Sequence, residues 1–304
     1  MSGPPRLFDR LLHRRRLDRA APGYASAAFL KRRAAEDIVQ RLETIRRSFP
    51  VAVDLGSRDG AFAEALAHSD AAAKFGVLFQ TDLSEAMLAG RPGQRLVADE
   101  EQLPFAPESL DLVVSTLALH WTNDFVGALI QIREALKPDG LFLGAMLGGA
   151  TLIELRAALM SAELELLGGS GPRVSPFADA FDASQLLQRA GFALPVADTD
   201  RVTVRYDHMF ALIADLRAMG ETSTLVEGAG RPLTRGVLAR AGEIYADKFS
   251  APDGRLTATF EILTLTGWAP DASQQKALRP GSAKMRLADA LKVTERSAGD
   301  RTGR

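Results

Sequence analysis

Carboxylate side chains follow three successive apolar segments in the first third of the sequence. The first segment, 51–55, leads into a turn that holds two glycines, and the next two segments are 75–79 and 96–97. The residues of this series that could contact a ligand are Asp54, Gly56, Gly60, Asp82, Asp99 and Glu100. Because open α/β sheets bind ligands at the carboxyl ends of their strands, we expect these residues to border one site.

The chemistry of these side chains restricts the ligand. Asp82 can accept hydrogen bonds from ribose hydroxyls, and Asp99 with Glu100 can accept one from an adenine amino group. Carboxylates along one sheet edge suit a nucleoside that carries a positive sulfonium, whereas they would repel the phosphates of a dinucleotide. Each aspartate taken singly is better explained as a helix cap or a solvated strand end. The joint pattern favours a nucleoside pocket.

The glycine turn of this series is irregular. Glycines at such a turn let the backbone approach a ligand without a Cβ in the way. Arg58 and Ala61 occupy the places where a G-x-G-x-x-G motif has its second and third glycines. Taken alone, the turn is explained almost as well by an ordinary structural role.

Alternating strand and helix patterns must position these residues. Strands are predicted over 51–55, 75–79, 96–97, 110–115 and 141–146, and helices fall between them. This alternation predicts an α/β, Rossmann-like fold with a doubly wound, mostly parallel sheet. Strand patterns over 202–206 and 256–268 predict a closing strand pair with an antiparallel strand. Helical patterns near 209–219 and 234–245 lie between them.

The predicted organisation is one domain over 1–293. Residues 209–251 form a helical insertion that we expect to cover the pocket, and the polar tail 294–304 is expected to be disordered. No Pro/Ser-rich linker divides the chain, and no internal repeat is present.

Composition excludes several classes of function. The net charge of −1 gives no global attraction to nucleic acid or to anionic membranes. The absence of cysteine rules out disulfides and thiolate chemistry, and the four histidines show no metal-ligand spacing. No apolar run approaches the roughly 20 residues of a membrane span. The arginine-rich segment around 14–19 is best explained as a solvated basic arm, with a transit peptide as the alternative.

Four motifs resemble those of class I S-adenosylmethionine (SAM)-dependent methyltransferases. They are D-L-G-S-R-D-G, T-D-L-S-E-A-M-L, A-D-E-E-Q-L-P-F and A-L-K-P-D-G. The resemblance implies that SAM is the cofactor, with its methionyl end framed by Asp54, Gly56 and Gly60. It further implies that Asp82 meets the ribose, while Asp99 and Glu100 border the adenine. Arg58 stands where these enzymes have a glycine, so its side chain is expected to point away or to pair with the SAM carboxylate.

A narrower resemblance covers nearly the whole chain. Segments that carry it include F-D-R near the start, L-H-W-T-N-D, G-G-A-T-L-I-E-L-R, L-R-A-M-G-E and R-P-G-S-A. These segments resemble the arginine-hydroxylase assembly factors of respiratory complex I, known from mitochondria and with bacterial relatives. The resemblance implies SAM-dependent hydroxylation of an arginine in a complex I subunit. It also implies a protein partner, a cytoplasmic location or a mitochondrial one in the matrix, and at most peripheral membrane association through that partner.

Candidate catalytic residues follow the fourth predicted strand. His120 could act as a general base or position an arginine, and Trp121 could stack on a guanidinium. Packing at the lip of the sheet explains both residues equally well. A glutamate could pair with a substrate guanidinium, and the candidates are Glu154 and Glu221. For these two residues and for Arg156, a surface salt bridge is the favoured interpretation.

Two other functions are consistent with the sequence. One is an ordinary SAM-dependent methyltransferase, such as a malonyl-acyl carrier protein O-methyltransferase. The other is a non-catalytic assembly chaperone with a vestigial SAM pocket altered at Arg58.

Overall fold

The computed structural model describes residues 6–227, 232–275, 285 and 287–294, which form two compact units, Met1–Pro270 and Asp271–Arg304. The strands are β1 (Phe49–Leu55), β2 (Phe75–Asp82), β3 (Gln94–Val97), β4 (Leu110–Thr116), β5 (Leu136–Leu147), β6 (Ala193–Tyr206) and β7 (Leu256–Trp268). The helices of the first unit are α1 (Arg10–Ala20), α2 (Tyr24–Ala27), α3 (Phe29–Thr44), α4 (Ala61–Ala67), α5 (Glu85–Leu88), α6 (Phe125–Ala135), α7 (Ile153–Leu167), α8 (Ala180–Arg189), α9 (Met209–Ala218) and α10 (Arg235–Phe249). Short 3-10 turns span Ala21–Gly23, Asp70–Lys74 and Leu119–Trp121, and the second unit contains α11 (Leu287–Leu291).

All seven strands belong to one sheet in the order β3-β2-β1-β4-β5-β7-β6. The pairs β1–β2, β1–β4, β2–β3 and β4–β5 are parallel, while β7 is antiparallel to both β5 and β6. The predicted Rossmann-like α/β fold with an antiparallel closing strand is therefore confirmed. Strand β6 is longer than predicted, since it begins at Ala193 rather than near residue 202.

Alternate residues of each central strand point to opposite faces of the sheet, and helices cover both faces. On one face Ala52, Leu112 and Leu143 pack in a core with side chains of α3 and α4. On the other face Val53 and Phe142 pack in a second core with side chains of α6 and α8. This two-sided cover explains why the central strands are almost continuously apolar.

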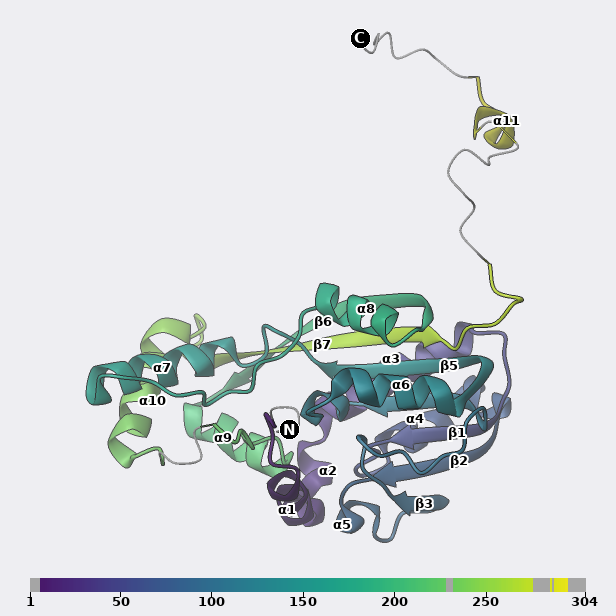
Figure 1. Cartoon of the computed structure of the whole chain (residues 1–304). Helices are drawn as coiled ribbons and strands as arrows, with labels where there is room; N and C mark the ends of the chain where they lie inside the picture. Colours follow the sequence, from purple (N-terminus) through teal and green to yellow (C-terminus); the bar gives the residue numbers. More distant parts are fainter. Residues whose placement is uncertain (1–5, 228–231, 276–284, 286, 295–304) are drawn as a thin grey trace, which may run out of the picture. The chain divides into compact units, whose positions relative to one another are not determined.

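Three helices extend the first unit beyond the central strands. Helices α9 and α10 connect β6 to β7, and α10 packs against α7, which follows β5. Figure 1 shows α7, α9 and α10 gathered at one end of the sheet, with α1 and α2 beside α9. The predicted insertion over 209–251 corresponds to this α9–α10 connection.

The arginine-rich N-terminal segment is an ordered helix, so the expectation of a solvated arm was wrong. Arg14, Arg15 and Arg19 are exposed, but His13 and Leu17 on the opposite side of α1 are fully buried. Helix α1 is amphipathic because its buried positions recur at helical spacing.

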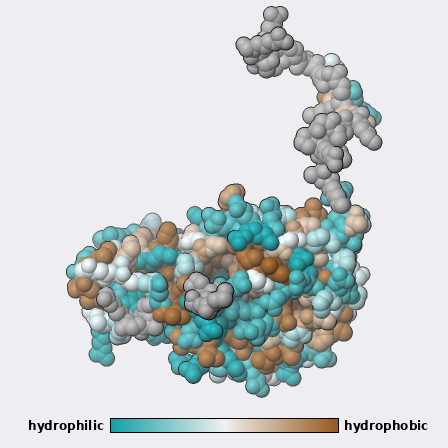
Figure 2. All heavy atoms as spheres, in the orientation of Figure 1, coloured by the Kyte–Doolittle hydropathy of each residue, from teal (hydrophilic) through white to brown (hydrophobic). Residues whose placement is uncertain are grey.

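Figure 2 shows hydrophilic and hydrophobic residues interspersed on the face of this unit that is in view. Among the described residues, no helix has the length and apolar character required to cross a membrane. The predicted tail lies outside the described residues from 295 onward, and the domain limit at 293 stays a prediction.

Candidate active site

The turn after β1 is built from residues with left-handed backbone. Gly56 and Gly60 have φ of +74° and +80°, a region that disfavours side chains with a Cβ. A Cβ at Gly56 would lie 2.3 Å from the Cβ of Ala118. Both glycines therefore have a structural reason to be present, whether or not a ligand binds here. Arg58, between them, has a φ of +52°.

Asp54 at the end of β1 is a buried carboxylate without a hydrogen bond. Neither of its side-chain oxygens has a partner, and burial raises the pKa of Asp54 to about 7 against the opposing charge of Lys31. Lys31 of α3 is also buried, and its Nζ donates to the carbonyl oxygens of Gly56 at 2.8 Å and Thr116 at 2.6 Å. Burial lowers the pKa of Lys31 to about 8, while Asp54 opposes that shift. This lysine ties the glycine turn to the end of β4.

Arg58 makes an internal ion pair that neither expectation included. Its side chain is fully buried and turns onto Asp82, to which Nη1 donates at 2.8 Å and the backbone N–H at 2.9 Å. Asp82 also accepts the backbone N–H of Ser84 at 2.9 Å. Burial alone would lower the pKa of Arg58, but the carboxylates of Asp82 and Glu100 raise it overall.

A second arginine, Arg10 of α1, covers the carboxylates that follow β3. Its Nη2 donates to Asp99 Oδ1 at 2.6 Å and also to Glu100 Oε2, while Nη1 donates to the backbone oxygen of Trp121 at 3.3 Å. Arg58 links Asp82 to this group, because its Nη1 donates to Asp82 and also lies 3.9 Å from Glu100 Oε1. We name Asp54, Asp82, Asp99, Glu100 and the turn 56–60 the carboxylate edge.

His120 and Trp121 lie in the 3-10 turn after β4 and share one acceptor. His120 Nε2 is 3.1 Å from Glu221 Oε2, and the indole N–H of Trp121 donates to the same oxygen at 2.7 Å. His13 of α1 stacks on Trp121, with ring centroids 4.6 Å apart. Glu221 is thus a partly buried carboxylate held by two side chains, not the surface salt bridge that the sequence favoured.

The other two charged candidates, Glu154 and Arg156, have structural partners. Glu154 accepts hydrogen bonds from the backbone N–H and the hydroxyl of Thr259, at 3.1 and 2.5 Å. Arg156 Nη2 donates to the carbonyl oxygen of Ser175 at 2.9 Å. Neither residue lines the cavity described next.

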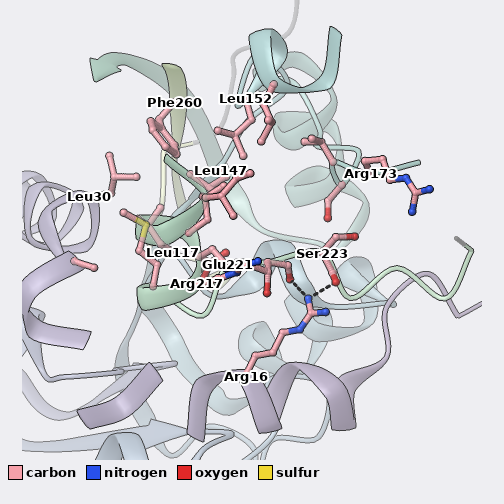
Figure 3. Close-up of a pocket in the computed structure, with 18 of the residues that line it drawn as sticks. Arg16, Leu30, Leu117, Leu147, Leu152, Arg173, Arg217, Glu221, Ser223 and Phe260 are labelled. Carbon is pink, nitrogen blue, oxygen red and sulfur yellow. Dashed lines mark hydrogen bonds between the residues drawn. The ribbon is translucent and has the colours of Figure 1, made fainter. Parts of the chain in front are cut away.

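A cavity of about 420 Å³, here the apolar cavity, lies beside the carboxylate edge. Its polar lining includes Lys31, Trp121 and Glu221, so it borders both groups of residues described above. Figure 3 shows Arg16, Glu221 and Ser223 together on one side and Leu152 and Phe260 on the other. The apolar lining comes from several elements and includes Leu30, Leu117, Leu147, Leu155, Leu159, Phe177, Phe210, Ile213, Leu216, Leu233 and Leu238.

Buried polar atoms without partners concentrate around these two regions. Most such atoms in the described chain belong to Arg10, His13, Asp54, Ser57, Arg58, Asp59, Glu100 and His120. Buried polar groups in folded proteins are nearly always hydrogen-bonded, so a cluster of exceptions needs an explanation. A polar ligand bound at the carboxylate edge would supply the missing partners.

Sequence reasoning missed three contributors to the site. Arg10 and His13 stand on one side of α1 at i, i+3 spacing, a signal obscured by the neighbouring run of arginines. Lys31 directly follows Leu30, the first residue of the apolar stripe of α3, and nothing in the sequence separates it from a solvated lysine.

Comparison with known proteins identifies the family to which this geometry belongs. A family model described as a methyltransferase domain matches residues 53–144, which contain the whole carboxylate edge. The mitochondrial arginine-hydroxylase NDUFAF5 of Danio rerio is 40% identical over 294 residues, covering 94% of this chain and 90% of that protein. The Homo sapiens protein of the same name is 40% identical over 294 residues, covering 94% and 84%. The chain belongs to the NDUFAF5 arginine-hydroxylase family.

Membership in this family agrees with the fold. A methyltransferase structure from Bacillus halodurans has a TM-score of 0.53 and 17% identity, and covers 78% of this chain and 99% of its own. That likeness shows the fold alone. A malonyl-[acyl-carrier protein] O-methyltransferase of Methylovorus is 33% identical over 287 residues, covering 90% of this chain and 93% of that enzyme. The resemblance to class I methyltransferases and to arginine hydroxylases is thereby confirmed, and the chain is an enzyme of methyltransferase type.

Proposed function

We propose that this chain hydroxylates an arginine in a subunit of respiratory complex I, with SAM as its cofactor, and so acts as an assembly factor. The observation that carries the proposal is Glu221, the one carboxylate among the described residues that line this largely apolar cavity. The reaction would run in the cytoplasm of a bacterial cell or in the matrix of a mitochondrion. The two relatives described above are mitochondrial.

Glu221 has the properties of a guanidinium acceptor. His120 and Trp121 fix its Oε2, and no described residue donates a hydrogen bond to Oε1. Carboxylate and guanidinium form strong charge-assisted pairs, and an apolar wall accommodates the aliphatic stem of an arginine. Two arginines of the lining are already engaged, since Arg16 donates to the carbonyl oxygens of Thr222 and Ser223, and Arg173 pairs with Glu163.

The residues of the carboxylate edge fit SAM. We assign the SAM ammonium to Asp54, whose oxygens lack partners, and the ribose hydroxyls to Asp82. We assign the adenine amino group to Asp99 and Glu100, with Gly56 and Gly60 shaping the methionyl end. Arg58 Nε and Nη2 have no partner and can receive the SAM carboxylate while Nη1 stays on Asp82. When bound, SAM would supply a positively charged sulfonium. The oxygen atom and the two-electron oxidation that hydroxylation requires would come from a separate oxidant such as dioxygen with a reductant.

His120 and Trp121 have defined parts in this proposal. His120 and Trp121 hold the Glu221 carboxylate in place, and the Trp121 ring lines the cavity where it meets the carboxylate edge. The guanidinium would therefore be placed near the cofactor and shielded from water, the geometry that orientation-dependent catalysis requires.

Each of the two other functions has one observation in its favour. The 33% identity to an O-methyltransferase supports methyl transfer, because that enzyme shares nearly the full length of this chain. The buried pair of Arg58 with Asp82 supports a chaperone with a closed pocket, because this pair must coexist with SAM or be displaced by it.

Intact-mass spectrometry of the complex I subunits, from cells with and without this protein, tests the proposal. We expect one subunit to gain the mass of one oxygen atom only when the protein is present, and fragmentation should place that atom on an arginine. A gain of one methylene would instead establish the methyltransferase. Normal assembly with unmodified subunits would establish the chaperone.

A further inference from the structure

We infer that the apolar cavity recognises, besides the target arginine, a large apolar side chain within two positions of it in the protein substrate. This inference rests on the proposed function and adds a rule for substrate choice. Pockets of about 300–1,000 Å³ enclose drug-sized ligands, so a cavity of about 420 Å³ holds much more than one guanidinium and its stem.

One side of the cavity carries Glu221, while Arg173 on the opposite side is paired with Glu163. Glu221, Ser223 and Arg16 lie on one side in Figure 3, and Leu152 and Phe260 lie on the opposite side. A guanidinium on Glu221 therefore leaves the walls formed by α7, β7 and α10 without a partner. Water is a poor occupant of a space with such walls, because it would find few hydrogen-bonding groups there.

A peptide segment fits both parts at once. Consecutive Cα atoms are about 3.8 Å apart, and in an extended chain residues two positions apart point to the same side. A neighbour of the bound arginine thus reaches the apolar side without a separate binding event. A free acyl chain fits less well, because it carries no cation to pair with the carboxylate of Glu221.

Peptides with one arginine test this inference with the full-length protein and SAM, under the conditions in which the natural subunit is modified. Each flanking position would carry Phe, Leu, Ser or Asp in turn, and mass spectrometry would give kcat/KM. Burial of one large apolar side chain predicts a preference of about 10- to 100-fold for Phe or Leu over Ser at one position or more.

A change to the cavity wall should remove that preference. Leu159 of α7 lines the cavity and is 5% exposed, so Leu159→Trp should lower kcat/KM for the Phe peptide to that of the Ser peptide. Leu166→Trp on the same helix is the control, since Leu166 is 53% exposed. Thermal melts establish that both variants fold. A Leu159→Val variant, which enlarges the cavity, should keep the preference and provides a second measurement if Leu159→Trp fails to fold.

The outcomes separate this inference from the proposed function. Equal rates for all arginine peptides would overturn the inference and leave arginine modification intact. No modification of the natural subunit would instead refute the proposed function, and the inference with it. An octanoyl thioester serves as the probe for an acyl chain. If it bound tightly to wild type and equally to Glu221→Gln, and if all peptides reacted at equal rates, the cavity would be assigned to an acyl chain and the inference would be overturned.

Discussion

The carboxylate edge and the apolar cavity meet at Lys31 and Trp121, yet the two regions are built differently. The edge consists of buried charges that pair with one another, through Arg58 and Arg10, and that leave several polar atoms without partners. The cavity consists mainly of aliphatic and aromatic walls with one anchored carboxylate, Glu221. The edge can therefore bind a polar ligand by exchanging internal ion pairs for contacts with that ligand. The cavity would select by its shape and by Glu221, the one carboxylate of its described lining, which stands among several lining cations.

This difference has a consequence for substitutions. Loss of a charge at the edge leaves its buried partner uncompensated and affects stability as well as cofactor affinity. Replacement of Glu221 by glutamine mainly affects what enters the cavity, because a glutamine keeps an oxygen that can accept hydrogen bonds from His120 and Trp121. Matched measurements of cofactor affinity and arginine modification therefore separate the two regions.

The largest effect is expected at Glu221. Glu221→Gln should raise the transition-state free energy of arginine modification by about 2–5 kcal/mol, the range for truncation of one partner of a buried charge pair. SAM affinity by calorimetry should stay within about twofold of wild type, because the hydrogen bonds of Glu221 go to His120 and Trp121 and not to residues of the carboxylate edge. Glu243→Gln on the exposed surface of α10 is the control. Equal loss of SAM affinity and modification would place Glu221 in the cofactor site.

The next largest effect is expected at Asp82. Asp82→Asn should weaken SAM binding by about 1.5–3 kcal/mol, the range for hydrogen bonds to charged groups. The variant should also unfold at lower urea concentration, because the buried guanidinium of Arg58 loses its counter-charge. Calorimetry and urea unfolding measure the two effects separately. Unchanged SAM affinity would remove Asp82 from the cofactor site.

Much of the carboxylate edge could be predicted from the sequence, because parallel strands carry their carboxyl ends to one side of a sheet. The order of strands alone brings Asp82, Asp99 and Glu100 together. Glu221 could not be predicted, since it meets Trp121 only through the packing of a segment 100 residues further along the chain. The inward direction of Arg58 likewise depends on how Asp82 and α1 close over it.

A smaller effect concerns pH and Asp54. Burial raises the pKa of this carboxyl from 3.8 to about 7. Between these two pH values the native state therefore keeps a proton on Asp54 that the unfolded chain has lost. The stabilisation from Asp54 is therefore present below about 4 and is lost as pH rises through about 7, at about 1.4 kcal/mol per pKa unit.

The ionised form of Asp54 is the one that would hold the SAM ammonium, so SAM affinity should rise as pH increases through about 7. Asp54→Asn should flatten both trends, which calorimetry and urea unfolding over a pH series would measure. If the pH dependence of SAM affinity persisted in this variant, another group would be the acceptor of the ammonium.

The smallest effect is expected at His13, where the two regions meet. This imidazole is fully buried, stacks on Trp121 and has no partner at either nitrogen. Burial, followed by the charges of Arg58 and Arg10, keeps its pKa well below 6.5, so the native state stays neutral where the unfolded chain takes up a proton. A depressed pKa of this kind gives stability that is lost as pH falls below 6.5. His13→Phe keeps the stack and removes the unpartnered nitrogens, so its unfolding free energy should rise by about 1 kcal/mol at neutral pH.

The unfolding free energy of His13→Phe should exceed that of wild type by a growing amount as the solution is acidified below pH 6.5, because Phe has no proton to gain on unfolding. Urea unfolding over a pH series measures this difference, and His68→Phe on the exposed end of α4 is the control. SAM calorimetry on the same variant then decides what the imidazole is for. Unchanged SAM affinity would make His13 only a support for Trp121. A several-fold loss with undiminished stability would show that a ring nitrogen contacts the cofactor, and the boundary between edge and cavity would then run through α1.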